Sequence, residues 1–135
     1  MIKRVLGVAA ATALALTGLA APASAGGATT LAGDCYTAVT YPLGFMVDTS
    51  SDYVLTPTLY GSTHCNDVNI HTTSSAFRAC VIRTYQGQSD CSSYTSVGTS
   101  WVVPSGGSGI PNGAAFKVKL LGGPVGRPIY GTIAY

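Results

Sequence analysis

The sequence contains no glutamate, and only 9% of its 135 residues carry a formal charge. Disorder requires low hydrophobicity and high net charge, whereas this chain has 47% hydrophobic residues and a net charge of +2. The same composition excludes a highly charged coiled coil and a strongly basic nucleic-acid-binding protein. What remains is a small globular protein, and one domain is expected at this length.

The N-terminal residues 1–25 have the pattern of a secretory signal peptide. A basic start is followed by an apolar stretch over residues 5–20 and by the small residues 23–25 (ASA), which signal peptidase accepts. A glycine and a proline interrupt the apolar run, and no stop-transfer cluster follows it, which disfavours a membrane anchor. We therefore expect a secreted, extracellular protein that begins at Gly26.

Removal of the signal peptide leaves five Asp against five Lys or Arg, so the formal charge of the mature chain balances to zero with His neutral. Electrostatic attraction to nucleic acid or to anionic lipid therefore has no support. We expect neither a nucleic-acid partner nor a membrane partner after cleavage.

Four cysteines lie in the mature chain, at Cys35, Cys65, Cys80 and Cys91. An even count in an exported chain predicts two disulfides. We favour Cys35–Cys65 with Cys80–Cys91, and the alternative of Cys65–Cys80 with Cys35–Cys91 stays open. The spacing includes no close C-x2-C pair, so a metal site is not expected. We expect no cofactor.

Short runs that alternate apolar and polar residues dominate the mature chain, and turn residues separate them. Residues 35–41, 99–103 and 129–135 are expected strands, with Pro42 ending the first of them. The residues 114–121 alternate most clearly, which indicates one buried and one solvated face.

The pattern predicts an all-β fold, an antiparallel β-sandwich or barrel of about eight short strands. We expect a flexible leader over residues 26–34 and a single β domain over residues 35–135 that is cross-linked by the two disulfides. The proline at position 57 places residues 54–60 at a sheet edge or a bulge. An exposed edge there, or at residues 129–135, would allow self-association.

Part of the chain resembles a known group. The motifs CNDVNI at 65–70, ACVIRTY at 79–85, TSVGTSWVV at 95–103 and FKVKL at 116–120 are similar to small secreted β-proteins of actinobacteria. The resemblance covers about residues 60–135. It implies export and an all-β fold. The group has no established activity, so the resemblance carries over no site residue.

Catalytic chemistry has few candidate residues. Glycosidases usually need two carboxylates, and the Asp residues here lie mostly in expected turns. Asp67, in an expected strand, is a candidate for an outward-facing residue, a salt bridge to Arg78 or Arg83, or a site. His64 and His71 flank it, but seven residues separate them, so a regular strand places them on opposite faces. We expect no catalytic residue and no metal ligand.

Tyrosine is the unusual feature of the composition, with eight residues, all in the mature chain. Most are expected to pack in the sheets, and several on one exposed face would form a stacking platform for sugar rings. The candidate binding residues are Tyr53, Tyr60, Tyr94, Trp101 and Arg127. Arg127 lies in the glycine-rich loop GGPVGRP and would be the bait residue of a protease inhibitor. The other glycine-rich segment, residues 104–113, is expected to be a flexible connection.

We therefore expect a secreted, non-catalytic protein that binds a ligand or has a structural role at the cell wall or in the medium. Its expected partner is a cell-wall glycan or an extracellular protein. The alternative is a secreted protease inhibitor that uses the loop around Arg127. A small extracellular hydrolase is the third possibility.

Overall fold

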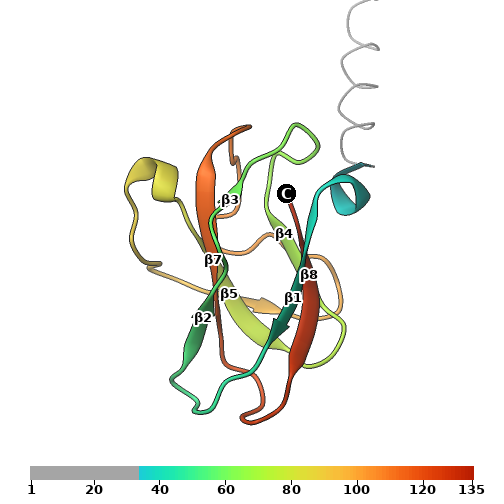
Figure 1. The fold of residues 1–135 in the computed structure, drawn as a ribbon, viewed down its shortest axis with the longest axis vertical. Helices are drawn as coiled ribbons and strands as arrows, with labels where there is room; N and C mark the ends of the chain where they lie inside the picture. The colour runs from blue at the N-terminus through green and yellow to red at the C-terminus, as the bar shows by residue number, and fades with distance from the viewer. Residues whose placement is uncertain (1–33) are drawn as a thin grey trace, which may run out of the picture.

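A computed structural model describes residues 34–135 (Figure 1). The predicted signal peptide, and all but the last residue of the predicted leader, lie outside the described residues. In the described part, eight strands form two antiparallel sheets that face each other as a sandwich. The predicted all-β class is thus confirmed, and the sandwich is the form it takes.

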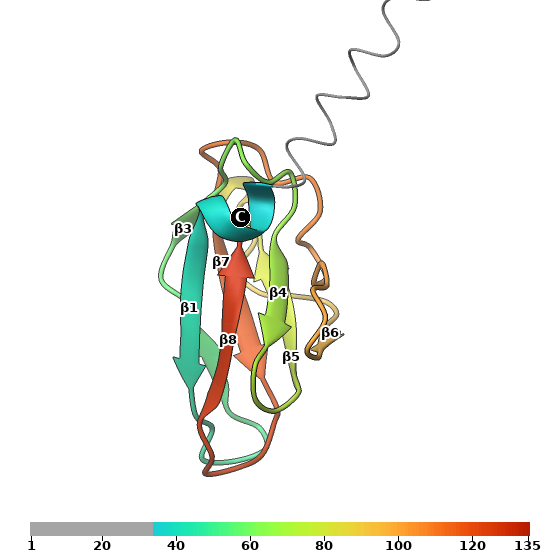
Figure 2. The ribbon, with the colours of Figure 1, turned by 90° about the vertical axis from the view of Figure 1, so that its right-hand side faces the viewer.

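The first sheet has the strand order β1–β8–β4. Its members are β1 (Thr40–Phe45), β4 (Asn69–Thr72) and β8 (Ile129–Ala134). Figure 2 shows β8 between the other two strands, with the second sheet behind them. Strand β8 is therefore the centre of this sheet, and the expectation that residues 129–135 form an exposed edge is wrong.

The second sheet has the order β2–β7–β5–β6, and β3 also pairs with β7. Its members are β2 (Tyr53–Leu55), β3 (Leu59–Tyr60), β5 (Phe77–Ile82), β6 (Thr95–Val97) and β7 (Ala115–Leu121). A 3-10 helix, η1 (Thr84–Gln86), leaves the end of β5. On β7 the predicted alternation is confirmed, because Phe116, Val118 and Leu120 are buried in the core between the sheets.

Pro57 lies at the sheet edge, as its missing N–H requires. Leu55 pairs with Lys119 and Leu59 with Phe116, so four steps along this edge match three steps along β7. The extra residue makes a bulge. At the bulge the Thr56 hydroxyl takes the place of a backbone acceptor, because it accepts a hydrogen bond from the Val118 N–H at 2.9 Å.

Three expected strand features are wrong. Residues 34–38 form a helical turn where the β-rich composition of residues 35–41 predicts a strand. Pro42 does not end a strand but lies inside β1, paired with Thr132, because an edge strand leaves alternate N–H positions facing solvent. Residues 99–103 do not form a regular strand, and only Val102 makes an isolated bridge, to Ile70.

Both disulfides form in the favoured pairing. Cys35 joins Cys65 across 30 residues, and Cys80 joins Cys91 across 11 residues. The first ties the helical turn to the segment before β4, and the second closes the loop that carries η1. Among residues 34–135 no helix is long and apolar enough to span a membrane.

Candidate functional site

The outer face of the first sheet carries no formal charge. Side chains alternate along each strand, so the core side chains Ile129 and Ile133 leave Tyr130 and Thr132 pointing outward on β8. On the flanking strands, Gly44 is the register partner of Tyr130, and His71 is the register partner of Thr132. None of the three strands contains Asp, Glu, Lys or Arg. We call this surface the uncharged face.

Three aromatic rings from distant segments meet at one end of the uncharged face. Trp101 lies 4.1 Å from His71 and 4.8 Å from Tyr36, measured between ring centroids. The His71 ring belongs to β4, and Tyr36 belongs to the helical turn 34–38. Tyr36 is exposed, while the other two rings are half-buried. The three rings form a continuous aromatic wall, which we call the aromatic stack.

The first disulfide holds this stack in place. Trp101 packs against a small cluster of buried side chains, Cys35, Cys65 and Ala134. Because Cys35 lies in the helical turn, its bridge to Cys65 fixes the position of the turn. The neighbouring Tyr36 is thereby held beside Trp101. The Tyr36 and Trp101 rings are tilted by 34° to each other, and an aromatic pair contributes about 1 kcal/mol beyond its burial.

Tyr130 lies farther along the same face. A Cβ built on its partner Gly44 would lie 3.7 Å from two carbon atoms of the tyrosine ring, which is ordinary contact distance. One side of the ring therefore covers the glycine, and 53% of the residue remains exposed to solvent. Tyr130 thus offers an aromatic surface on the uncharged face.

The outer face of the second sheet is different. The formal charges on strands are confined to this sheet and are all positive: Arg78, Lys117 and Lys119. The Lys119 ammonium lies 4.3 Å from the centroid of the Tyr53 ring and 5.9 Å from that of Tyr94. Both rings are thereby engaged by a cation.

Asp90 forms an ion pair with Lys119 on this face: its Oδ1 lies 2.8 Å from the Lys119 Nζ. The Lys119 side chain is only 11% exposed, because the carboxylate and the two tyrosines cover it. Hydrogen bonds from Lys119 and from the Cys91 N–H lower the pKa of Asp90. The same pair raises the pKa of Lys119.

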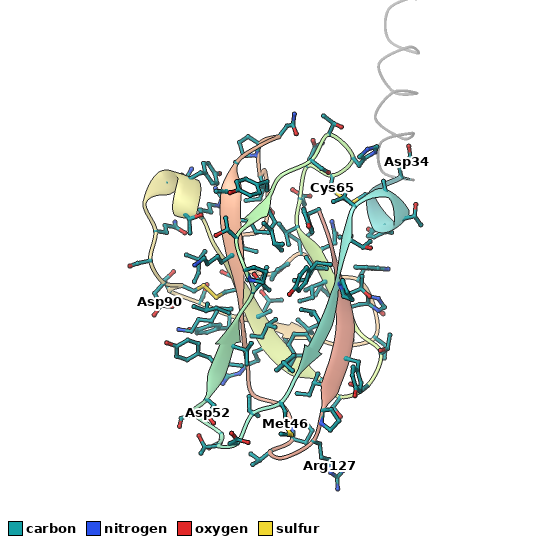
Figure 3. The ribbon with its side chains drawn as sticks, in the orientation of Figure 1. Asp34, Met46, Asp52, Cys65, Asp90 and Arg127 are labelled. Atoms are coloured by element: carbon teal, nitrogen blue, oxygen red, sulfur yellow. A yellow bond between two sulfur atoms is a disulfide. The ribbon has the colours of Figure 1, made fainter. Side chains whose placement is uncertain are left out.

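The five predicted binding residues do not gather on one surface. Tyr53 and Tyr94 lie beside Lys119, Trp101 lies in the aromatic stack, and Tyr60 is exposed on β3. Arg127 is exposed in a loop at the end of the sandwich opposite Cys65 (Figure 3). That loop is tied to its neighbour by the hydrogen bond from the Gly126 N–H to the Val47 carbonyl, at 2.9 Å. Whether any of the five binds a ligand stays a prediction.

Sequence reasoning missed Tyr36, His71 and Tyr130 as members of one surface. A periodic pattern shows which residues of one strand share a face, but it does not show which strands become neighbours. The signal that could have found Tyr130 was its strand, IYGTIA, in which an exposed tyrosine alternates with buried isoleucines.

Asp67 has a structural role instead of the proposed salt bridge. Its carboxylate accepts a hydrogen bond from the Gly109 N–H at 2.7 Å, and the one ion pair among residues 34–135 joins Lys119 and Asp90. Asp67 therefore helps to pin the glycine-rich segment 104–113. Buried Ile110, at 4% exposure, pins it further, so the segment is fastened to the fold rather than a free connection.

The His64, Asp67 and His71 group does not converge. His71 lies in the aromatic stack, and Asp67 lies in a bend before β4. Within residues 34–135, no group of three His, Cys, Asp or Glu side chains is placed to hold a metal ion. Comparison with family models, curated proteins and solved structures finds no match for the chain, and the resemblance to secreted actinobacterial proteins stays a prediction.

Proposed function

We propose that the protein is a non-catalytic extracellular protein that binds an uncharged glycan, such as a cell-wall polysaccharide, through the uncharged face. The observation that carries the proposal is the pairing of exposed aromatic surface with the absence of formal charge over all three strands of the first sheet. The aromatic stack and Tyr130 mark the two ends of the surface that would contact the glycan.

The chemistry of a neutral sugar fits this surface. The apolar faces of pyranose rings pack on aromatic rings, and tyrosine and tryptophan combine an apolar body with a polar tip. Thr132 and His71 lie as register partners on adjacent strands of this face and offer a hydroxyl and an imidazole to sugar hydroxyls. A charged side chain here would lose hydration without gaining a partner, and the face has none.

The predicted export agrees with a partner outside the cell. Both disulfides persist best in an oxidising compartment, and the N-terminal sequence has the signal-peptide pattern. A glycan outside the cell is therefore the partner that the chain would meet.

Co-sedimentation tests the proposal. The full chain is expressed with export, purified with both disulfides formed, and mixed with washed peptidoglycan, chitin or cellulose. We expect most of the protein in the pellet of at least one polymer, with release by a soluble fragment of that polymer. Retention on none of the three would overturn the proposal, and a panel of secreted proteases against Arg127 would then test the inhibitor alternative.

Matched tyrosine variants locate the surface. Tyr130→Ala and Tyr36→Ala should each weaken retention by about tenfold, the effect of losing about 1.4 kcal/mol of stacking. Tyr60→Ala is the control, because Tyr60 is exposed to 58%, close to the 53% of Tyr130, but lies on the second sheet. An equal loss in all three variants would show that the uncharged face is not the binding surface.

A further inference from the structure

A polar hollow of about 620 Å³ lies on the side of the sandwich away from the uncharged face. One wall is formed by the loop around residues 87–92, and the other by Ser105 and Gly106. In Figure 3 the labelled Asp90, which lines the hollow, lies on the side of β5 and β7. We propose that this hollow is a binding site for a small neutral sugar, one or two rings long.

The first wall is held in position before any ligand arrives. The Cys80–Cys91 bridge joins the end of the loop to β5, and the Asp90–Lys119 ion pair fastens it to β7. Near the start of the loop, the Arg83 N–H donates to the Gln88 side-chain oxygen at 3.1 Å. A preformed wall spares a ligand the entropic cost of ordering the loop.

The second wall is fixed as firmly. The Ser105 carbonyl accepts from the Val81 N–H at 2.7 Å, and the Ser105 N–H donates to the Thr95 hydroxyl at 2.9 Å. The Arg83 guanidinium donates to the carbonyls of Gly106 and Ser108. Gly106 is required here, because a Cβ would lie 2.5 Å from the Val81 carbonyl oxygen.

The chemistry of the lining favours a neutral, hydroxyl-rich ligand. Both charged groups already have partners: the Arg83 guanidinium donates to two carbonyls, and Asp90 Oδ1 is paired with the Lys119 ammonium. The hydroxyls of Ser89 and Ser92 and the amide nitrogen of Gln88 bond to no other residue in the range 34–135. The serine hydroxyls both donate and accept, and the Gln88 amide nitrogen donates, so together they match the hydroxyls of a sugar.

The size of the hollow agrees with this class of ligand. Small-molecule sites usually enclose about 300–1,000 Å³. Most such sites are lined by apolar side chains, whereas the lining here is rich in serine, glutamine and aspartate. The lining therefore favours a polar ligand of sugar size over a lipid or another apolar ligand. The site is independent of the uncharged face, which lies on the other sheet.

Amide chemical shifts test the site on the exported, oxidised full chain. The probes are glucose, N-acetylglucosamine and its β-1,4-linked disaccharide, with glycerol as a polyol that lacks a ring. We expect saturable shifts at residues 87–92 and 105–106 for at least one sugar, with a Kd of about 1 mM. No saturable shift there for any of the three sugars, or an equal response to glycerol, would overturn the inference.

Two filling variants make the test specific. Ser92→Leu and Ser89→Leu place bulk in the hollow at exposed positions that form no hydrogen bond with another described residue, so the fold should survive. Each should weaken sugar binding at least about tenfold. Ser96→Leu is the matched control, because Ser96 is exposed on β6 outside the hollow. Undiminished binding in both filling variants would overturn the site.

Failure of this inference is distinguishable from failure of the proposed function. Ser92→Leu should co-sediment with the insoluble glycan as the unmodified protein does, while Tyr130→Ala should keep its amide shifts at the hollow. Shifts confined to the uncharged face would overturn the hollow and leave the proposed function standing.

Discussion

On the first sheet the Tyr130 ring covers Gly44 and leaves a surface open to solvent, whereas on the second sheet Lys119 lies against the Tyr53 ring. The two tyrosines are exposed to nearly the same extent, 53% and 56%. They differ in what lies beside them. A sugar that stacked on the ring face contacted by Lys119 would have to displace an ammonium group that is itself paired with Asp90.

The difference shows why a count of tyrosines does not locate a binding surface. All charged residues on the strands lie on the second sheet. Tyr53 and Tyr94 therefore lie beside a cation, whereas the aromatic residues of the uncharged face do not. The first of these two groups fastens a loop to a sheet. The members of the second group that lie on the uncharged face are the ones that the proposed function assigns to a ligand.

The largest expected effect comes from the first disulfide, which supports the aromatic stack. Replacing Cys35 and Cys65 by Ala should lower the free energy of unfolding by about 4 kcal/mol, since the bridge spans 30 residues. The same change at Cys80 and Cys91, which are 11 apart, should cost about 3 kcal/mol. Urea unfolding monitored by far-ultraviolet circular dichroism measures both. A larger cost for the second pair would show that strain or packing, not loop length, sets the order.

The next effect is a break in the sheet under the uncharged face. In Gly131→Ala, the new Cβ would lie 2.3 Å from the His71 carbonyl oxygen, so β8 and β4 must separate. The expected loss is about 3 kcal/mol. Gly44→Ala is the control, because its Cβ meets only the Tyr130 ring at 3.7 Å. Thermal unfolding of the two variants compares them, and equal melting temperatures would contradict the close approach of the two strands.

A smaller change makes the first sheet resemble the second. Thr132→Lys places an ammonium between Tyr130 and the aromatic stack, where it can lie against the rings as Lys119 does. Retention on the insoluble glycan should fall about tenfold, with the fold unchanged. Ser96→Lys adds the same charge to the second sheet and should leave retention intact. Equal retention by Thr132→Lys and Ser96→Lys would show that a positive charge on the uncharged face does not weaken glycan binding.

The smallest effect concerns the ion pair on the second sheet. The lowered pKa of Asp90 means that the pair stabilises the fold above the unfolded pKa of about 3.9 and is lost as pH falls through the lower folded value. The raised pKa of Lys119 means that its contribution is present below about 10.4 and is lost as pH rises through the folded value. Asp90→Asn should flatten both limbs of a plot of melting temperature against pH.

Two other groups serve as internal controls for this titration. Hydrogen bonds from Thr49 lower the pKa of Asp52, so Asp52→Asn should flatten the acid limb alone. Burial raises the pKa of Tyr135, so some alkaline slope should remain in Asp90→Asn. An unchanged alkaline limb in Asp90→Asn would show that the pair contributes nothing to stability.

Much of the sandwich could be predicted from local pattern. The alternation of Phe116, Val118 and Leu120 on β7 and the edge position of Pro57 follow from side-chain period and from the missing N–H of proline. The helical turn at 34–38 could not be predicted in this way. The β-rich residues there are overruled by a bridge to Cys65 and by contact with Trp101, both of which come from distant parts of the chain.

The candidate site was less predictable than the fold. The aromatic stack joins residues 36, 71 and 101, and the sequence pattern contains no information about such distant partners. The hollow depends on the loop closed by Cys80 and Cys91, whose pairing the sequence favoured but left open. The position of β8 at the centre of its sheet was likewise hidden, because its neighbours β1 and β4 come much earlier in the chain.

The central place of β8 has a consequence for the order of folding. Strands β1 and β4 do not pair with each other. Each of them pairs with β8, which follows both in the sequence. Whether the chain emerges from a ribosome or a translocation pore, the first sheet can close only after residue 134 is free. The nascent chain therefore keeps the edges of β1 and β4 that face β8 without their hydrogen-bond partners until β8 is available. Completion of the first sheet by β8 therefore delays its closure, which agrees with the export that the signal-peptide pattern predicts.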